Sequence, residues 1–197
     1  MPPGTGLLIV DMQNDFALPG APLCVAGAAA TIPRIAAILE AFRRAELPVF
    51  HARREYRADG SNVEKVRQRA FFSAGGFLLP GSAGAVIVDE LSPREHEPVF
   101  TKPRFSAFMM TDLLVVLQRR AIRRLVVAGT QLPDCVRSTV YDALCYDFDV
   151  IVLRDGTSSQ REEVHEANLA DLSRVGATID TCLEVIRQVD AGLLARP

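Results

Sequence analysis

The chain has 197 residues, of which 49% are hydrophobic and 23% charged, and its formal net charge is −2. That length fits one domain, 1–197, able to bury a core without disulfides. The slightly acidic balance gives no electrostatic reason to expect binding to nucleic acid or to an anionic membrane. No apolar run approaches the ~20 residues of a membrane span, and the first residues lack the basic stretch of a signal peptide. Four cysteines without a CxxC pair are typical of reduced thiols and predict a cytoplasmic protein: Cys24, Cys135, Cys145 and Cys182.

Short apolar runs predict six β-strands, in the order 6–10, 48–52, 98–101, 124–129, 149–153 and about 177–180. These runs are continuously apolar rather than alternating, which is typical of strands that are covered on both faces. Longer amphipathic stretches lie between them. A strand followed by a helix, repeated along the chain, predicts an α/β protein with three α/β/α layers and a mostly parallel sheet of about six strands.

The helices are predicted from apolar stripes and from residues that cap helix starts. Thr31 is expected to cap a helix that carries Ile32, Ile35, Leu39 and Phe42 on one face. The S-x-x-E patterns at 61–64 and within 159–163 predict two capping boxes. Further stripes follow Thr111 (Leu113, Leu114, Leu117) and Cys135 (Val136, Val140, Ala143, Leu144). The conformation of 73–97 stays open, including whether 84–88 forms a further short strand.

Three side chains with useful chemistry come directly after predicted strands. Asp11 follows the first strand, Lys102 follows the third, and Cys135 lies a short loop beyond the fourth, at a predicted helix start. Taken singly, they have ordinary interpretations as a helix cap, a surface charge and a small core residue. In an open parallel sheet, however, ligands bind beyond the carboxyl ends of the strands. An acid, a cation and a thiol at that one edge therefore indicate a catalytic site.

The chemistry of these three groups fits acyl transfer. Only a thiolate attacks well, and a helix N-terminus and Lys102 would both favour it, while Asp11 could accept the thiol proton. Passing that proton to a departing amine gives a two-step reaction through a thioester. The loop 129–134 would supply N–H groups to the oxyanion, with Gly129 suited to the sharp exit from the strand, although Pro133 has no N–H to donate.

The sequence resembles the isochorismatase-like cysteine hydrolases, which include nicotinamidases, N-carbamoylsarcosine amidohydrolases and ureidoacrylate hydrolases. The resemblance covers nearly the whole chain and is carried by LLIVDMQNDF, REYRADGSNVE, TKPRFSAFMMTDL, VVAGTQLPDCVRSTVYDA and DGTSSQREEVHEANLADL. It implies a Rossmann-like fold in which Asp11 matches the family's base, Lys102 its lysine and Cys135 its nucleophile. It also implies a cis peptide at Thr130–Gln131, with the amides of Gln131 and Cys135 forming the oxyanion hole.

Further side chains are candidates for substrate binding. Gln13 and Phe16 follow Asp11 and could line the pocket, although Gln13 could instead brace the turn, and Phe105 could supply an apolar wall. Arg54 and Tyr56, in the charged stretch after the second strand, could form an entrance that binds a polar or anionic substrate tail. A solvated loop is the alternative interpretation of that stretch.

Neither a metal nor a nucleotide cofactor is expected. Many nicotinamidases hold a metal through an Asp-x-His pair and a further His after the second strand, whereas this chain has HARREYR at 51–57. His51 is therefore interpreted as a packing or pocket residue. The glycines lack the GK[ST] ending of a phosphate-binding loop.

These observations predict a metal-independent cysteine amidohydrolase that cleaves a C–N bond of a small amide or carbamoyl (ureido) compound through a thioester. A nicotinamidase is the alternative within the enzymes. A catalytically silent subunit for small-molecule binding or assembly is the alternative outside them. A homo-oligomer, either a dimer or a tetramer, is also expected, since closed symmetry is common and the family often assembles.

Overall fold

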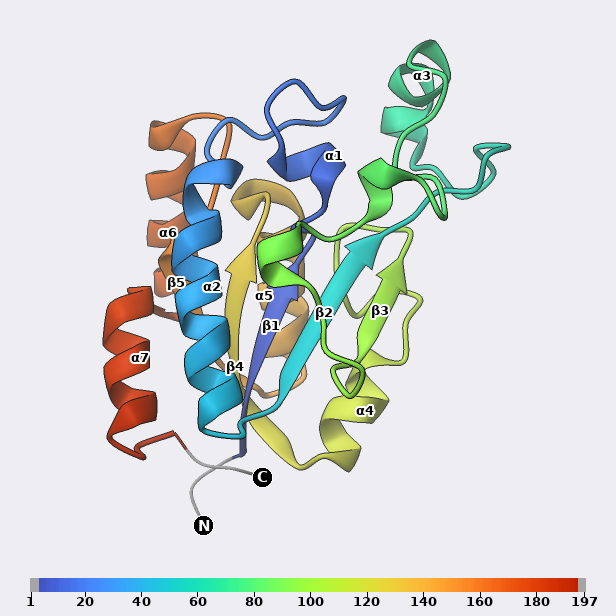
Figure 1. The fold of residues 1–197 in the computed structure, drawn as a ribbon. Helices are drawn as coiled ribbons and strands as arrows, with labels where there is room; N and C mark the ends of the chain where they lie inside the picture. The colour runs from blue at the N-terminus through green and yellow to red at the C-terminus, as the bar shows by residue number, and fades with distance from the viewer. Residues whose placement is uncertain (1–3, 195–197) are drawn as a thin grey trace.

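The computed structural model describes residues 4–194, which fold around a six-stranded sheet (Figure 1). The strands are β1 (Gly4–Val10), β2 (Val49–Arg54), β3 (Val99–Lys102), β4 (Ile122–Gly129), β5 (Asp149–Thr157) and β6 (Thr178–Asp180). Their order is β3-β2-β1-β4-β5-β6, and every neighbouring pair is parallel. The predicted α/β fold is confirmed. The fifth strand is longer than predicted, because the chain continues in extended form past Leu153 to Thr157.

Helices cover both faces of the sheet, as predicted. The helices are α1 (Asn14–Ala17), α2 (Ala28–Arg44), α3 (Lys65–Ser73), α4 (Leu113–Arg119), α5 (Arg137–Cys145), α6 (Glu162–Arg174) and α7 (Cys182–Asp190). Side chains of α2 and α7 belong to one buried cluster and those of α4, α5 and α6 to a second. The two clusters take alternate residues of β1, such as Leu7 and Leu8, because successive strand side chains point to opposite faces.

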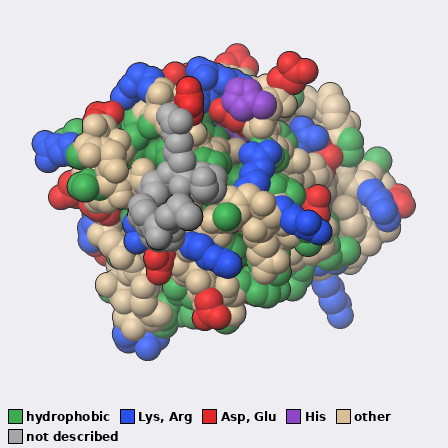
Figure 2. Space-filling view, turned by 90° about the horizontal axis from the view of Figure 1, so that it is seen from below, with side chains coloured by type: hydrophobic (Ala, Val, Ile, Leu, Met, Phe, Trp, Pro, Cys, Tyr) green, Lys and Arg blue, Asp and Glu red, His purple; other side chains and the backbone are tan. Residues whose placement is uncertain are grey.

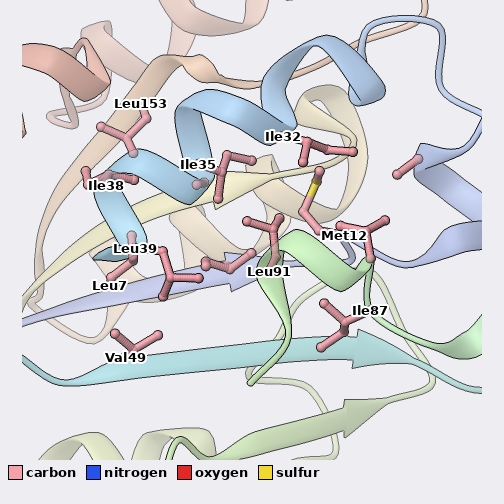
Figure 3. Close-up of a cluster of buried hydrophobic side chains, with 14 of the residues drawn as sticks. Leu7, Met12, Ile32, Ile35, Ile38, Leu39, Val49, Ile87, Leu91 and Leu153 are labelled. Atoms are coloured by element: carbon pink, nitrogen blue, oxygen red, sulfur yellow. The ribbon is translucent and has the colours of Figure 1, made fainter. Parts of the chain in front are cut away.

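Helix α2 packs along the first face of the sheet (Figure 3). Its Ile35, Ile38 and Leu39 are fully buried and lie beside the strand residues Leu7 and Val49. Burying a side chain of this size contributes roughly 1.5–3 kcal/mol relative to leaving it in water. The apolar stripe read from the sequence is therefore what fixes this helix on the sheet.

The helix starts differ from the predictions. Helix α2 begins at Ala28, and Thr31 lies inside it with its hydroxyl donating to the Ala28 carbonyl, because the alanines before it are good helix formers. The pattern at 61–64 forms no capping box, since Glu64 turns inward to Arg54 and Tyr56. Helix α6 begins without a side-chain cap. A capping box occurs instead at the start of α7, between Thr181 and Glu184.

The segment 73–97 packs over α1 and contains two short 3-10 helices, η1 (Ala83–Ala85) and η2 (Asp89–Leu91). It is tied down by the Asn14 N–H, which donates to the Val86 carbonyl, and by the Leu78 N–H, which donates to Asp15. Residues 84–88 contribute only an isolated bridge between Ile87 and Gln13, so they add no strand to the sheet.

The surface opposite the carboxyl ends of the strands carries interspersed positive and negative side chains (Figure 2). A face of this kind lacks the single-sign field that steers polyanions to a protein. Within residues 4–194, no helix combines the length and apolarity that crossing a membrane requires.

Candidate active site

Four charged or nucleophilic side chains meet beyond the carboxyl ends of four neighbouring strands. Asp11 follows β1 directly, Arg54 and Lys102 are the last residues of β2 and β3, and Cys135 lies beyond the end of β4. The strand order β3-β2-β1-β4 makes these ends adjacent. The structure thus brings together Asp11, Lys102 and Cys135, the three residues predicted from the sequence, and adds Arg54 to them.

Asp11 and Lys102 form a fully buried ion pair. The Lys102 ammonium donates to Asp11 Oδ2 over 2.6 Å and to the Arg104 carbonyl over 3.1 Å. The other carboxylate oxygen, Oδ1, is buried and has no hydrogen-bond partner among the described residues. Asp11 has φ of 52°, which is unusual for a residue other than glycine and is often found where function dictates the backbone. The pair therefore presents one free acceptor oxygen inside the protein.

Cys135 lies in a single wide helical turn of the π type, η3 (Leu132–Val136), which leads into α5. Burial raises the pKa of its thiol to about 11, even though the charges of Lys102 and Arg54 lower it; the charge of Asp11 raises it further. Lys102 thus favours the thiolate, as expected, but desolvation outweighs both cations, so the pKa of the resting thiol is raised overall. At neutral pH the sulfur carries its proton until a base removes it.

The loop between β4 and η3 approaches β1 very closely. Gly129 has φ of 121°, and a Cβ placed there would lie 2.0 Å from the Val10 carbonyl oxygen, so only glycine fits, as predicted. The Thr130–Gln131 peptide is cis, as the family resemblance implied. Among the described residues, the Gln131 N–H has no hydrogen-bond acceptor, whereas the Leu132 N–H donates to the Ser158 carbonyl. The Gln131 N–H is thus available to a ligand.

Comparison with known proteins identifies the family to which this fold belongs. The family model for the isochorismatase domain matches residues 5–182. The chain belongs to the isochorismatase family. It is 37% identical over 183 residues to a protein of Arabidopsis thaliana named as a probable inactive nicotinamidase, covering 91% of this chain and 93% of that one.

Two further relatives of this isochorismatase-family chain are informative. An N-carbamoylsarcosine amidase of Arthrobacter sp is 31% identical over 184 residues, which are 92% of this chain and 70% of the amidase. The crystal structure of an isochorismatase family protein from Desulfovibrio vulgaris subsp. vulgaris str. Hildenborough superposes with a TM-score of 0.90 at 42% identity, covering 98% of this chain and all (100%) of that chain. The fold predicted from the sequence is therefore shared with solved members of the family.

Arg54 does not form an entrance in this isochorismatase-family chain. Its side chain is fully buried, and Nη2 donates to Cys135 Sγ over 3.2 Å, while Nε lies 3.9 Å from Asp11 Oδ2. Burial alone would lower the pKa of Arg54, but its anionic neighbours hold it above its ordinary value. The predicted contact with a substrate tail is replaced by contact with the Cys135 sulfur, because the last residue of β2 points into the site rather than into solvent.

Tyr56 and Gln13 are also drawn into the protein rather than toward a ligand. The buried Tyr56 hydroxyl donates to Glu64 over 2.5 Å and accepts from Arg54 over 2.8 Å. The Gln13 amide donates to the carbonyls of Arg54 and Ala85 and accepts from the Arg54 N–H, so it braces the end of β2. Of the two interpretations of Gln13 given by the sequence, the bracing one describes its contacts.

A cavity of about 270 Å³ opens onto Cys135. Phe16 lines it, as predicted, and Phe105 lies outside it, under the guanidinium groups of Arg54 and Arg67 at 5.1 and 5.5 Å from the ring centroid. Gln131, named from the sequence for its amide, also lines the cavity, and lining residues that the sequence did not single out include Leu23, Cys24, Arg67 and Gln160. Arg67 and Glu64 were missed because each belongs to a stretch with the composition of a solvated loop or helix.

The residues after β2 do not fit a nicotinamidase-type metal. The stretch 51–57 holds no Asp-x-His pair, and its Arg54 and Tyr56 are a cation and a hydroxyl already bonded to Glu64. His51 is buried within β2 beside Glu97, at 3.3 Å, and burial lowers its pKa, so it packs as predicted. In the described part of the chain, the one cluster with the geometry for a metal lies on α6 and contains none of the site residues: Glu162, His165 and Glu166.

Proposed function

We propose that this isochorismatase-family chain is a cysteine amidohydrolase that cleaves a C–N bond of a small amide or carbamoyl compound through a thioester, without a metal. The observation that carries the proposal is the contact of Lys102 with Asp11 beside a cysteine that lines a cavity. The N-carbamoylsarcosine amidase among the relatives supports the same class of bond. An idle pocket has no physical need to bury an acid, a lysine and a thiol together.

The contacts support one sequence of steps. Cys135 Sγ attacks the carbonyl carbon while its proton moves to Asp11, whose Oδ1 is free to accept it. The negative charge that develops on the carbonyl oxygen is bound by the N–H groups of Gln131 and Cys135. Asp11 then gives the proton to the departing amine, which leaves a thioester on Cys135. Water attacks that thioester, its proton passes to Asp11 and returns to the sulfur, and the acid is released.

The cavity limits and orients the substrate. At about 270 Å³ it lies just below the range of pockets that take drug-sized ligands, so it suits a small molecule. Arg67 lines it, and its Nε is buried without a hydrogen-bond partner among the described residues. A donor in that position favours a substrate that carries a further acceptor oxygen. Phe16 and Leu23 provide apolar walls.

Metal independence is supported by the charges already present. Lys102 and Arg54 lie within 2.6 and 3.9 Å of the Asp11 carboxylate, and a metal ion beside them would be repelled. We expect full activity after dialysis against EDTA. Loss of activity that zinc, iron or manganese restores would contradict the proposal and would favour a metal-bearing nicotinamidase.

One observation favours a silent binding subunit as a second candidate. The relative with 37% identity is named as a probable inactive nicotinamidase. That name concerns nicotinamide in that protein, and it leaves hydrolysis of other amides open for this chain. The screen that tests the proposal therefore has to include nicotinamide and a binding measurement.

The experiment is a screen for ammonia release from primary amides, nicotinamide and ureido compounds. The native protein should hydrolyse at least one compound, and Cys135→Ala should abolish that turnover while Cys145→Ala, at an exposed thiol, keeps it. Activity that survives Cys135→Ala above a few per cent would show that the nucleophile is wrongly assigned. Calorimetric binding without any hydrolysis by the native protein would favour the silent subunit.

We also propose that the chain forms a homo-oligomer. Large apolar side chains are exposed on α3 and in the loop before α4, namely Val66, Phe72, Met109 and Met110, and exposed apolar patches mark association sites. Light scattering should give a multiple of the 21.5 kDa chain mass; the monomer mass at micromolar concentration would contradict this. The four unpaired cysteines favour a reducing compartment such as the cytoplasm.

A further inference from the structure

Arg54 stands out because a fully buried guanidinium touches the sulfur of the candidate nucleophile. Nη2 donates to Cys135 Sγ over 3.2 Å and to the Arg104 carbonyl over 2.9 Å. Nη1 donates to the Tyr56 hydroxyl over 2.8 Å and to Glu64 over 2.9 Å. These contacts use the four hydrogens of the two terminal nitrogens, so the group has no terminal donor left for a substrate.

The position of this guanidinium is fixed from three sides. Glu64 holds one end, and Tyr56 bridges Arg54 and Glu64. The Phe105 ring lies 5.1 Å from the guanidinium carbon. Gln13 holds the backbone of Arg54 through both its N–H and its carbonyl. A side chain held this firmly offers its charge to the sulfur in one orientation, with little reorganisation during a reaction.

The charges around the sulfur balance before and after proton transfer. Asp11 pairs with Lys102, and Arg54 pairs with Glu64, so the four groups sum to zero while Cys135 keeps its proton. When the proton moves from Cys135 to Asp11, the sulfur becomes negative and the carboxylate neutral, and the sum is unchanged. The thiolate that forms then lies against the Arg54 guanidinium. In a buried site, that contact is much stronger than it would be in water.

We propose that Arg54 is a further catalytic residue, which stabilises the Cys135 thiolate through a direct hydrogen bond as Asp11 removes the proton. Tyr56 and Glu64 act as positioning residues that aim the guanidinium at the sulfur. The place of Arg54 in the reaction rests on the proposed function. The ease of forming the thiolate is a property of the protein alone, however, and can be measured without any substrate.

The test compares two variants of the Arg54–Glu64 pair. Both leave the net charge of the site unchanged. Arg54→Met combined with Glu64→Gln removes both charges, whereas Arg54→Lys keeps a cation beside the sulfur. The rate of Cys135 alkylation by iodoacetamide is followed by peptide mass spectrometry between pH 6 and 9. We expect the double variant to react about tenfold more slowly than the native protein at each pH, and Arg54→Lys to stay within about threefold of it.

A matched control uses a partly buried ion pair outside the site. Arg43 and Glu97 are bonded through two contacts of 2.8 Å, and neither belongs to the candidate site. Arg43→Met combined with Glu97→Gln should destabilise the fold without changing the Cys135 rate. Native rates in both Arg54 variants, or equal changes in the Met and Lys variants, would overturn the proposal.

The single variant Glu64→Gln covers the case in which the double variant does not fold. It keeps an acceptor for Arg54 but removes the negative charge behind it, so Cys135 should react at least about threefold faster. A rate that is unchanged or slower would count against an electrostatic role. If the native protein hydrolyses no amide, the proposed function fails, while these rates still decide whether Arg54 acts on the thiol.

Discussion

Replacing Lys102 by methionine removes the amine that lies 2.6 Å from Asp11 Oδ2. Both partners are fully buried, and removing one member of such a pair leaves an uncompensated charge that typically costs 3–5 kcal/mol. Arg54 remains 3.9 Å from the same oxygen and offsets part of the loss. We therefore expect Lys102→Met to lower the free energy of unfolding by about 3 kcal/mol at pH 7 and to abolish turnover.

The double variant Asp11→Asn with Lys102→Met isolates the cause. It removes both charges, so it should be more stable than Lys102→Met alone by at least about 1 kcal/mol, although it is equally inactive. Urea unfolding measured by fluorescence or circular dichroism gives these free energies. Arg124→Met serves as the control, because Arg124 pairs with the largely exposed Asp149 at 3.3 Å and should change stability by less than about 1 kcal/mol.

The result that would refute this reasoning is specific. A double variant that is as unstable as Lys102→Met, or less stable, would mean that the cost does not come from a stranded carboxylate. The stability of the site would then depend on the packing of the lysine stem rather than on charge compensation.

Two further predictions concern residues that shape the fold. Burial raises the pKa of Glu97, but bonds from Arg43 and the Arg94 N–H outweigh it and lower the value from 4.5 to about 2. Roughly 3 kcal/mol of stability is therefore present above pH 4.5 and lost as the pH falls toward 2. Unfolding measured as a function of pH should show that Glu97→Gln removes this loss of stability in acid. A variant that loses as much stability in acid as the native protein would disprove the prediction. Gly129→Ala places a Cβ 2.0 Å from the Val10 oxygen, so melting temperature and turnover should both drop; native values would contradict the close approach.

The sheet and the positions of Asp11, Lys102 and Cys135 could be predicted because they follow from the order of strands and helices alone. Continuously apolar strands with intervening helices dictate a parallel sheet, and a parallel sheet gathers its carboxyl ends at one edge. A residue that follows a strand is therefore placed even when side-chain contacts are unknown. The cis peptide, and the expectation that two amides bind an oxyanion, came from family resemblance alone, since no periodicity encodes them.

The buried positions of the Arg54, Tyr56 and Glu64 side chains could not be predicted in the same way. Their stretch is charged, which is the composition of a solvated loop, and S-x-x-E there has the form of a helix cap. The opposite charges instead neutralise one another inside the protein, where pairing makes burial of ionic groups tolerable. Local sequence patterns indicate the conformation that one segment prefers by itself, whereas this cluster forms between two segments, the end of β2 and the start of α3.

In the proposed reaction, the raised pKa of Cys135 and the free oxygen of Asp11 mean that the buried thiol becomes a nucleophile only when Asp11 removes its proton. A thiol with a pKa of about 11 is almost fully protonated at pH 7, and a protonated thiol reacts slowly with alkylating agents and oxidants. A fixed acceptor, Asp11 Oδ1, and two cations near the sulfur lower the cost of moving the proton internally once a carbonyl carbon occupies the cavity. Under this proposal, activation of the thiol depends on the presence of substrate rather than on the pH of the solution. On this reasoning, the burial that makes Cys135 a poor thiolate at rest also strengthens the contacts that stabilise the thiolate during attack.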